Sequence, residues 1–117
     1  MTVSHIIVIL SKCDLIKEFK ILDINIEPPV QSIKVRAYLK NGQMLQITES
    51  VGEDFRRYSY HLQDGERIIK RWDNAPHWNN VRTYPFHAHV GDQKEPIESK
   101  EMFVSDLLDE IKRICCL

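Results

Sequence analysis

The sequence has little of what marks several common classes of protein. Only three of its 117 residues are cysteines, and no Cys-x-x-Cys spacing occurs among them. A disulfide scaffold is therefore not expected, and the reducing cytoplasm is the expected compartment. The apolar run HIIVIL at positions 5–10 is six residues long, whereas a helix that crosses a bilayer needs roughly 20 apolar residues. We therefore expect no membrane span.

No charge of one sign dominates either. Sixteen Lys and Arg stand against seventeen Asp and Glu, for a net charge of −1, so no overall field attracts nucleic acid or an anionic membrane. Any such binding has to come from a local patch. The content of 43% hydrophobic and 28% charged residues is typical of a folded globular chain. A length of 117 residues fits one hydrophobic core, and we expect a single domain over residues 1–117.

Alternating apolar and polar residues predict about five antiparallel strands over residues 17–73. The alternation is clearest at 33–40, where apolar side chains occupy every second position. Asn41-Gly42 follows at once and predicts a type I′ hairpin turn, and Asp64-Gly65 predicts a second hairpin. If residues 87–89 are also extended, the meander has six strands.

The end of the chain carries the clearest helix signal. From Phe103 to Cys115 apolar residues recur at spacings of three and four, which gives one apolar stripe. Ser99 is a fair N-cap, and Asp106 lies early, where the helix dipole favours negative charge. Residues 4–14 could form a short helix or a buried strand, because a continuous apolar run shows no clear period. The expected fold is α+β, with an antiparallel meander sheet of about five to six strands covered by the C-terminal helix.

Residues 71–92, RWDNAPHWNNVRTYPFHAHVGD, concentrate the reactive side chains of the chain. This stretch holds both tryptophans, three of the five histidines and two of the five prolines. Side chains two positions apart on a strand point the same way. His87 and His89 therefore share a face if this piece is extended. The same holds for Tyr58 and Tyr60 on an earlier strand.

Three interpretations of this cluster are open. The histidines could ligate a divalent metal, although their spacings match no standard ligand motif. They could instead act as acid and base on a phosphodiester, since histidine titrates near neutral pH. Arginines would then stabilise the phosphate charge, and aromatic rings would stack on unpaired bases. In the third interpretation the polar groups only bond the backbone of a folded loop.

Three motifs of this region resemble the signature of the TumE-like toxin family. They are YSYH at 58–61, RWDNAPH at 71–77 and YPFHAH at 84–89. Proteins of that family are small and are encoded beside a DNA-binding antitoxin in type II toxin–antitoxin modules. Two positions depart from the family pattern, because Trp78 and Phe86 stand where many relatives have histidine.

The resemblance, which covers about residues 30–115, implies the toxin half of such a pair. The residue types, rather than the resemblance, point to a ribonuclease that needs no metal. The candidate catalytic residues are His77, His87, His89, Arg71, Asp73 and Tyr60. The candidate substrate-binding residues are Tyr58, His61, Trp72, Asn74, Trp78 and Arg82.

The expected partners are a cognate antitoxin with a DNA-binding domain, RNA as the substrate, and a second copy of the chain in a homodimer. No cofactor is expected. The alternative is a non-catalytic domain that acts through protein contacts, or one that holds a divalent metal at His77, His87 and His89.

Overall fold

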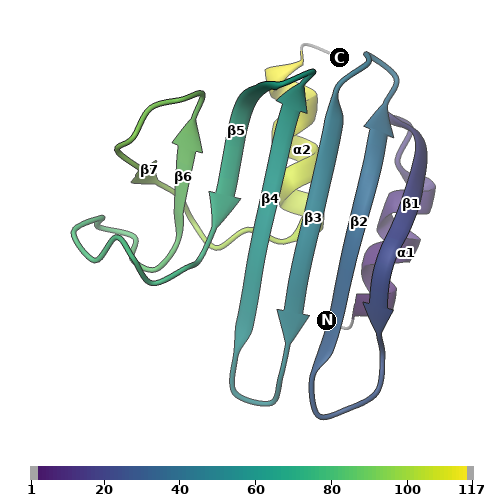
Figure 1. The fold of residues 1–117 in the computed structure, drawn as a ribbon, viewed down its shortest axis with the longest axis horizontal. Coiled ribbons are helices and arrows are strands. Elements are labelled where there is room, and N and C mark those ends of the chain that lie inside the picture. Colours follow the sequence, from purple (N-terminus) through teal and green to yellow (C-terminus); the bar gives the residue numbers. More distant parts are fainter. Residues whose placement is uncertain (1–2, 116–117) are drawn as a thin grey trace.

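In the computed structural model, which describes residues 3–115, a seven-stranded antiparallel sheet carries two helices on one of its faces (Figure 1). The strands follow chain order across the sheet. Their bounds are Ile16–Asn25 (β1), Gln31–Leu39 (β2), Met44–Val51 (β3), Arg56–Asp64 (β4), Arg67–Asp73 (β5), His87–Val90 (β6) and Ile97–Glu98 (β7). The helices are α1, Val3–Lys12, and α2, Val104–Ile114. The predicted α+β meander is confirmed, and β7 is a strand that the sequence did not indicate.

The apolar run near the N-terminus forms a helix, α1, and not a strand. Val3, Ile6 and Leu10 are buried, and spacings of three and four place them on one side of the helix. That side packs against β1, β2 and β3. Within the part of the chain that the structure describes, no helix is both long enough and apolar enough to cross a membrane.

The prediction that Ser99 caps the C-terminal helix was wrong. The N-cap of α2 is Phe103, whose backbone N–H donates to the Asp106 carboxylate at 3.0 Å. The residue just before it, Met102, is bound to β4, because its N–H donates to the Tyr58 hydroxyl at 3.2 Å and its carbonyl accepts from the Arg56 guanidinium at 2.7 Å. Asp106 does lie in the first turn, as the helix dipole favours.

The first hairpin turn also differs from the type I′ turn expected at Asn41-Gly42. The Gly42 N–H donates to the Leu39 carbonyl at 3.0 Å, so Lys40 and Asn41 are the central residues of the turn. Gly42 follows them with a φ of +91°, in the left-handed region that suits glycine. The loop is therefore one residue longer than predicted, and Leu39 pairs with Gln43 across it.

The two faces of the sheet differ in what covers them. The face toward the helices supplies the sheet's part of the hydrophobic core, where each large apolar side chain contributes on the order of 1.5–3 kcal/mol. These core residues are Ile33, Val35, Ala37, Leu39, Leu45, Ile47, Tyr58, Tyr60, Leu62, Trp72 and Ala88. Neither α1 nor α2 lies over the opposite face (Figure 1), which we call the open face. The polar residues that alternate with the core lie there.

Cys13 and Cys115 are free thiols. The third cysteine, Cys116, lies outside the described residues.

Candidate active site

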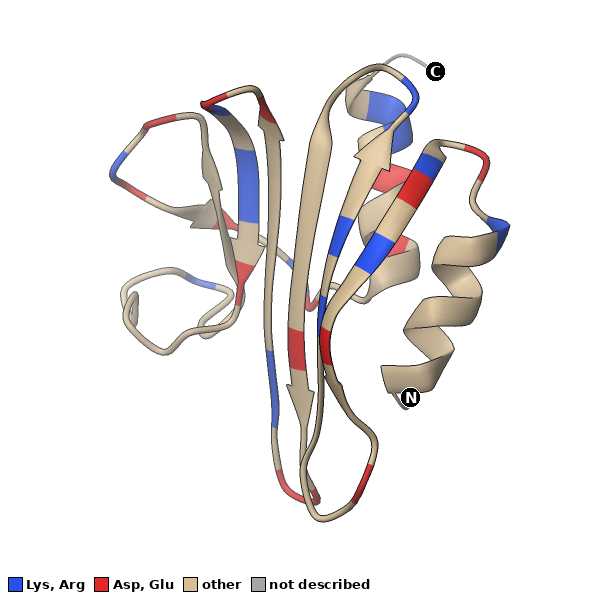
Figure 2. Cartoon of the chain, turned by 45° about the vertical axis from the view of Figure 1, so that its right-hand side comes forward, with Lys and Arg blue, Asp and Glu red and all other residues tan. Residues whose placement is uncertain are grey.

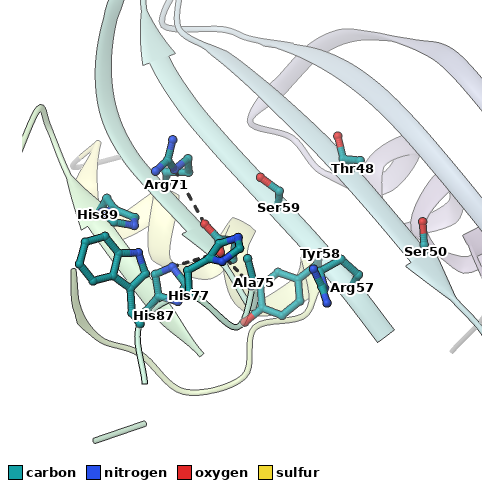
Figure 3. A pocket seen from close by; sticks show the side chains of 12 residues that line it. Thr48, Ser50, Arg57, Tyr58, Ser59, Arg71, Ala75, His77, His87 and His89 are labelled. Atoms are coloured by element: carbon teal, nitrogen blue, oxygen red, sulfur yellow. Dashed lines mark hydrogen bonds and ion pairs between the residues drawn. The ribbon is translucent and has the colours of Figure 1, made fainter. Parts of the chain in front are cut away.

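Strand pairing places polar residues of β4, β5 and β6 in two adjacent rows on the open face. In the first row Arg71 lies directly opposite His61 on one side and His89 on the other. The second row consists of Ser59, Asp73 and His87. Side chains that face each other across antiparallel strands lie about 4.5–5.5 Å apart at Cβ. Residues separated by up to 30 positions in the sequence therefore form one cluster (Figure 3).

A cavity of about 290 Å³ lies over these rows. The loop after β5 contributes His77 and Trp78 to its wall, and β4 contributes Ser59 and Arg57 (Figure 3). His77 and Arg57 are exposed and Trp78 is half-buried. A ligand in the cavity therefore meets cationic, aromatic and hydroxyl groups together, a combination suited to a polar, anionic molecule that also carries a ring.

His87 is fixed by two acceptors and is 2% exposed. Its Nδ1 lies 3.0 Å from the carbonyl of Pro85, and its Nε2 lies 3.1 Å from Asp73 Oδ1. A carbonyl and a carboxylate only accept hydrogen bonds. Both ring nitrogens of His87 therefore face acceptor atoms of the protein itself. Because both nitrogens are engaged, His87 has none free for a substrate.

His89 has a different environment. Its ring lies 5.1 Å from that of His87 and 5.8 Å from that of Trp78, in both cases edge to face. Burial, the guanidinium of Arg71 and the neighbouring His87 lower the pKa of His89, and Asp73 only partly opposes them. The environment of His89 therefore favours its neutral form, and a neutral imidazole can accept a proton.

Two buried nitrogens in the first row lack a hydrogen-bond partner in the part of the chain that the structure describes. Among the residues that the structure describes, neither Arg71 Nε nor His61 Nε2 makes a hydrogen bond. Arg71 Nε does face Asp73 Oδ2, but at 3.8 Å, which is too long for one. Burial and Arg71 lower the pKa of His61. A cation that lacks its full set of acceptors is suited to bind an anion.

Asn74 has a structural role at the exit of β5. Its side chain accepts from the Tyr58 N–H at 2.9 Å and donates to the Arg56 carbonyl at 2.7 Å, which continues the backbone pairing of β4. Asp73 also bonds the backbone, through the Ala75 N–H at 3.0 Å. The interpretation in which polar side chains bond the backbone of a folded loop therefore accounts for Asn74. It also accounts for one of the contacts of Asp73.

We expect Asn74→Ala to lower the free energy of unfolding by about 2 kcal/mol, because it leaves a buried N–H and a carbonyl of β4 without partners. Chemical denaturation measures the change. The matched control is Asn79→Ala, an exposed position in the same loop, which should change stability by less than about 0.5 kcal/mol. Equal effects of the two variants would contradict this role for Asn74.

Three predicted site residues have side chains on the helix-facing side of the sheet, although one of them, Tyr58, is also among the residues that line the cavity. Tyr58, Tyr60 and Trp72 have side chains that are at most 1% exposed. Tyr60 donates to Glu49 at 2.6 Å, and burial and the Glu49 charge raise the pKa of its hydroxyl. Burial raises the pKa of Tyr58 to about 12. All three rings belong to the core, and Tyr60 and Trp72 do not line the cavity.

Arg82 is placed outside the site as well. Its guanidinium binds Glu98 through two contacts of 2.8 and 2.9 Å, on the exposed surface at β7.

Ser59 lies within the cluster, although the sequence did not indicate it as a site residue. The motif YSYH contains the signal, because Ser59 alternates with the two buried tyrosines and so must face the other way.

Asp73, His87 and His89 are the residues that could hold a metal ion, because each offers a ligand atom within 4.8 Å of the others. Two histidines and a carboxylate suit several transition metals. Two features weigh against this use: Asp73 and His87 already bond each other at 3.1 Å, and Arg71 adds positive charge beside them. His77, which the sequence-based alternative included, is not a member of this group.

Taken together, the fold and the site define a small α+β protein with a histidine-rich pocket on the uncovered face of a meander sheet. The model of a family described as Toxin TumE matches residues 6–115. That match spans nearly the whole chain, which therefore belongs to the TumE toxin family, as the motifs indicated. The family supports a role as a toxin. Comparisons with curated proteins and with solved structures gave no match.

Proposed function

We propose that this toxin cleaves RNA without a metal, by moving protons between histidines and the phosphodiester. The observation that carries the proposal is the state of His89, a 7% exposed histidine in a pocket, with its pKa lowered beside an arginine. A base that stays neutral next to a phosphate-binding cation is what removal of a proton from a ribose hydroxyl requires.

The reaction follows from these positions. His89 takes the proton of the 2′-hydroxyl, whose oxygen attacks phosphorus, and a 2′,3′-cyclic phosphate forms. The 5′-oxygen leaves and takes a proton from a second histidine. His77 is our choice for that acid, because it lines the same cavity and is exposed, whereas both nitrogens of His87 are engaged.

Charge on the phosphate is stabilised by arginines in this proposal. The side chain of Arg71, which is 40% exposed, borders the cavity, and Arg57 borders it from the neighbouring strand. Preformed donors of this kind stabilise the charge that develops in the transition state more than that of the ground state. Trp78 supplies a partly exposed ring on which an unpaired base can stack.

Asp73 and His87 are positioning residues in this scheme. Asp73 lies 3.1 Å from His87 and 3.8 Å from Arg71, and His87 is one of the neighbours that lower the pKa of His89. They act on the reaction through Arg71 and His89.

The test is incubation of the purified chain with a mixed-sequence RNA, with and without EDTA, followed by mapping of fragment ends. We expect cleavage that survives EDTA, leaves 2′,3′-cyclic phosphate and is lost in a His77→Ala/His89→Ala variant. His5→Ala, at an exposed position on α1, is the matched control and should retain activity. Absence of cleavage under all conditions would rule out the proposal.

Metal-dependent cleavage is the second candidate, favoured by the close approach of Asp73, His87 and His89. The EDTA arm separates the two, since cleavage that stops with EDTA and returns with added Mn²⁺ or Zn²⁺ would assign these residues to an ion. If RNA is never cut, the remaining alternative is a domain that acts through protein contacts.

We also propose a cognate antitoxin with a DNA-binding domain as the partner of this chain. Membership of a toxin family supports this pairing. A small open reading frame with a helix-turn-helix pattern that overlaps this gene is the expected genomic context, and a solitary gene would count against the pairing.

A further inference from the structure

The outer edge of β1 is a long unpaired strand with apolar side chains. β1 has ten residues, and among residues 3–115 its one neighbour in the sheet is β2. Ile21, Leu22 and Ile24 on this strand are 42, 43 and 40% exposed. An edge of this length and composition is a ready template for pairing with another strand. The opposite edge of the sheet, β7, has only two residues.

A bulge determines how side chains are distributed along β1. Ile21 pairs with Val35 of β2, but Asp23 pairs with Lys34, so Leu22 is an extra residue without a partner. An extra residue reverses the alternation of faces beyond it. Lys20 and Asp23, three positions apart, consequently lie on the same face.

That face is the open one. Lys20 pairs with Arg36 and Asp23 with Lys34, two residues that alternate with the buried positions of β2. By the same pairing Phe19 and Ile24 lie on the helix-covered side, since their partners Ala37 and Ile33 belong to the core. Figure 2 shows basic and acidic residues following one another along β1.

We propose that β1 pairs antiparallel with β1 of a second copy of this chain, with Lys20 opposite Asp23 of the second copy. The two sheets then join into one continuous sheet about a two-fold axis perpendicular to it. The symmetry generates two such ion pairs. It also sets Phe19 against Ile24 on the helix-covered side, and Ile21 against Leu22 at the centre. The apolar side chains that β1 exposes in one chain become mutual contacts.

The charge order of β1 selects this register. Sliding one strand by two positions in one direction sets Glu18 opposite Asp23, two carboxylates that destabilise an antiparallel pair. Sliding it by two positions in the other direction sets Lys20 opposite Asn25 and loses the attraction between Lys20 and Asp23. Among the residues that the structure describes, neither Lys20 nor Asp23 has a salt-bridge partner within its own chain. A strand edge that complements itself points to a second copy rather than to an unrelated partner.

The test is sedimentation equilibrium of the full chain and of three charge variants. We expect the unchanged chain to dimerise with a measurable Kd. Lys20→Asp and Asp23→Lys each create two like-charge contacts in the dimer and should raise that Kd about tenfold or more. The double variant Lys20→Asp/Asp23→Lys restores opposite charges and should return the Kd to within about threefold of the original.

Lys40→Asp is the matched control. It reverses one exposed charge in the β2–β3 hairpin, and it should leave the Kd unchanged. Thermal unfolding of each variant verifies that it folds. A chain that stays monomeric up to about 100 µM, in the range of weak association, overturns the proposal. A dimer that the single reversals do not weaken, or that the double variant does not restore, also overturns it. If the chain is monomeric and a co-expressed antitoxin alone protects β1 from hydrogen exchange, the edge belongs to that partner instead.

Discussion

His89→Asn is expected to lower the rate of RNA cleavage by about 10²–10⁴-fold, the usual contribution of a general base. Asparagine keeps a polar side chain of similar reach, but it cannot take a proton near neutral pH. The neighbours of His89 are the rings of Trp78 and His87, and the smaller amide leaves their backbone positions in place. Cleavage by the variant is measured against His5→Asn, an exposed histidine on α1, which should behave as the unchanged chain.

The pH dependence of kcat/KM distinguishes a base from a residue that only supports the fold. Because His89 acts unprotonated, the rate should fall as the pH drops through the pKa of His89. Burial and Arg71 lower that pKa, so the acidic limb should lie below about pH 6.5, the ordinary value for histidine. Arg71→Gln removes a positive neighbour, raises the pKa of His89, and should move the limb to higher pH. A limb that stays in place in Arg71→Gln would contradict the assignment.

Arg56→Met is expected to lower the free energy of unfolding by about 3–5 kcal/mol, since it leaves a buried carboxylate without its cation. Arg56 donates to Glu49 from two nitrogens, at 3.2 Å each, and Glu49 is 2% exposed. The same guanidinium donates to the Met102 carbonyl at 2.7 Å. Its carbon lies 4.4 and 4.1 Å from the ring centroids of Tyr58 and Phe103. Arg56 thus ties β3 and β4 to the segment that leads into α2.

Two further variants test this account of Arg56 by chemical denaturation. The double variant Glu49→Gln/Arg56→Met removes both charges and keeps an acceptor for the Tyr60 hydroxyl, so it should be more stable than Arg56→Met alone. Arg57→Met changes the neighbouring arginine, which is exposed on the open face, and should cost less than about 0.5 kcal/mol. A double variant that is less stable than Arg56→Met would contradict a buried ion pair as the cause.

Local signals predicted the elements of this fold well where each position depended on its near neighbours. Period-two alternation indicated the strands of the meander, and three- and four-residue spacing indicated α2. The errors arose where a residue distant in the sequence determines the local structure. Ser99 has the residue type of an N-cap, but Met102 is bonded to Tyr58 and Arg56 of β4, and the helix begins at Val104. β7 is two residues long and exists because it pairs with β6, which no local pattern reports.

The candidate site, too, was predicted only in part from the sequence. The sequence indicated the cluster of residues 71–92 and the shared face of His87 and His89. It also placed Tyr60 in the site, and the structure buries that ring beneath the sheet. Alternation shows that two residues point the same way, but it does not show which face the helices cover.

By itself, the sequence determined that this chain forms an antiparallel meander and that its reactive residues gather on a few neighbouring strands. Only the tertiary structure decided which of them meet at a surface. Arg56 and Arg57 are adjacent and identical in type, yet Arg56 forms an ion pair with the buried Glu49 and Arg57 borders a pocket. The helices that cover one face come from the two ends of the chain (Figure 1). The packing of these two helices against the sheet is a long-range contact. It determines which of the two alternating sets of side chains is buried and which is exposed.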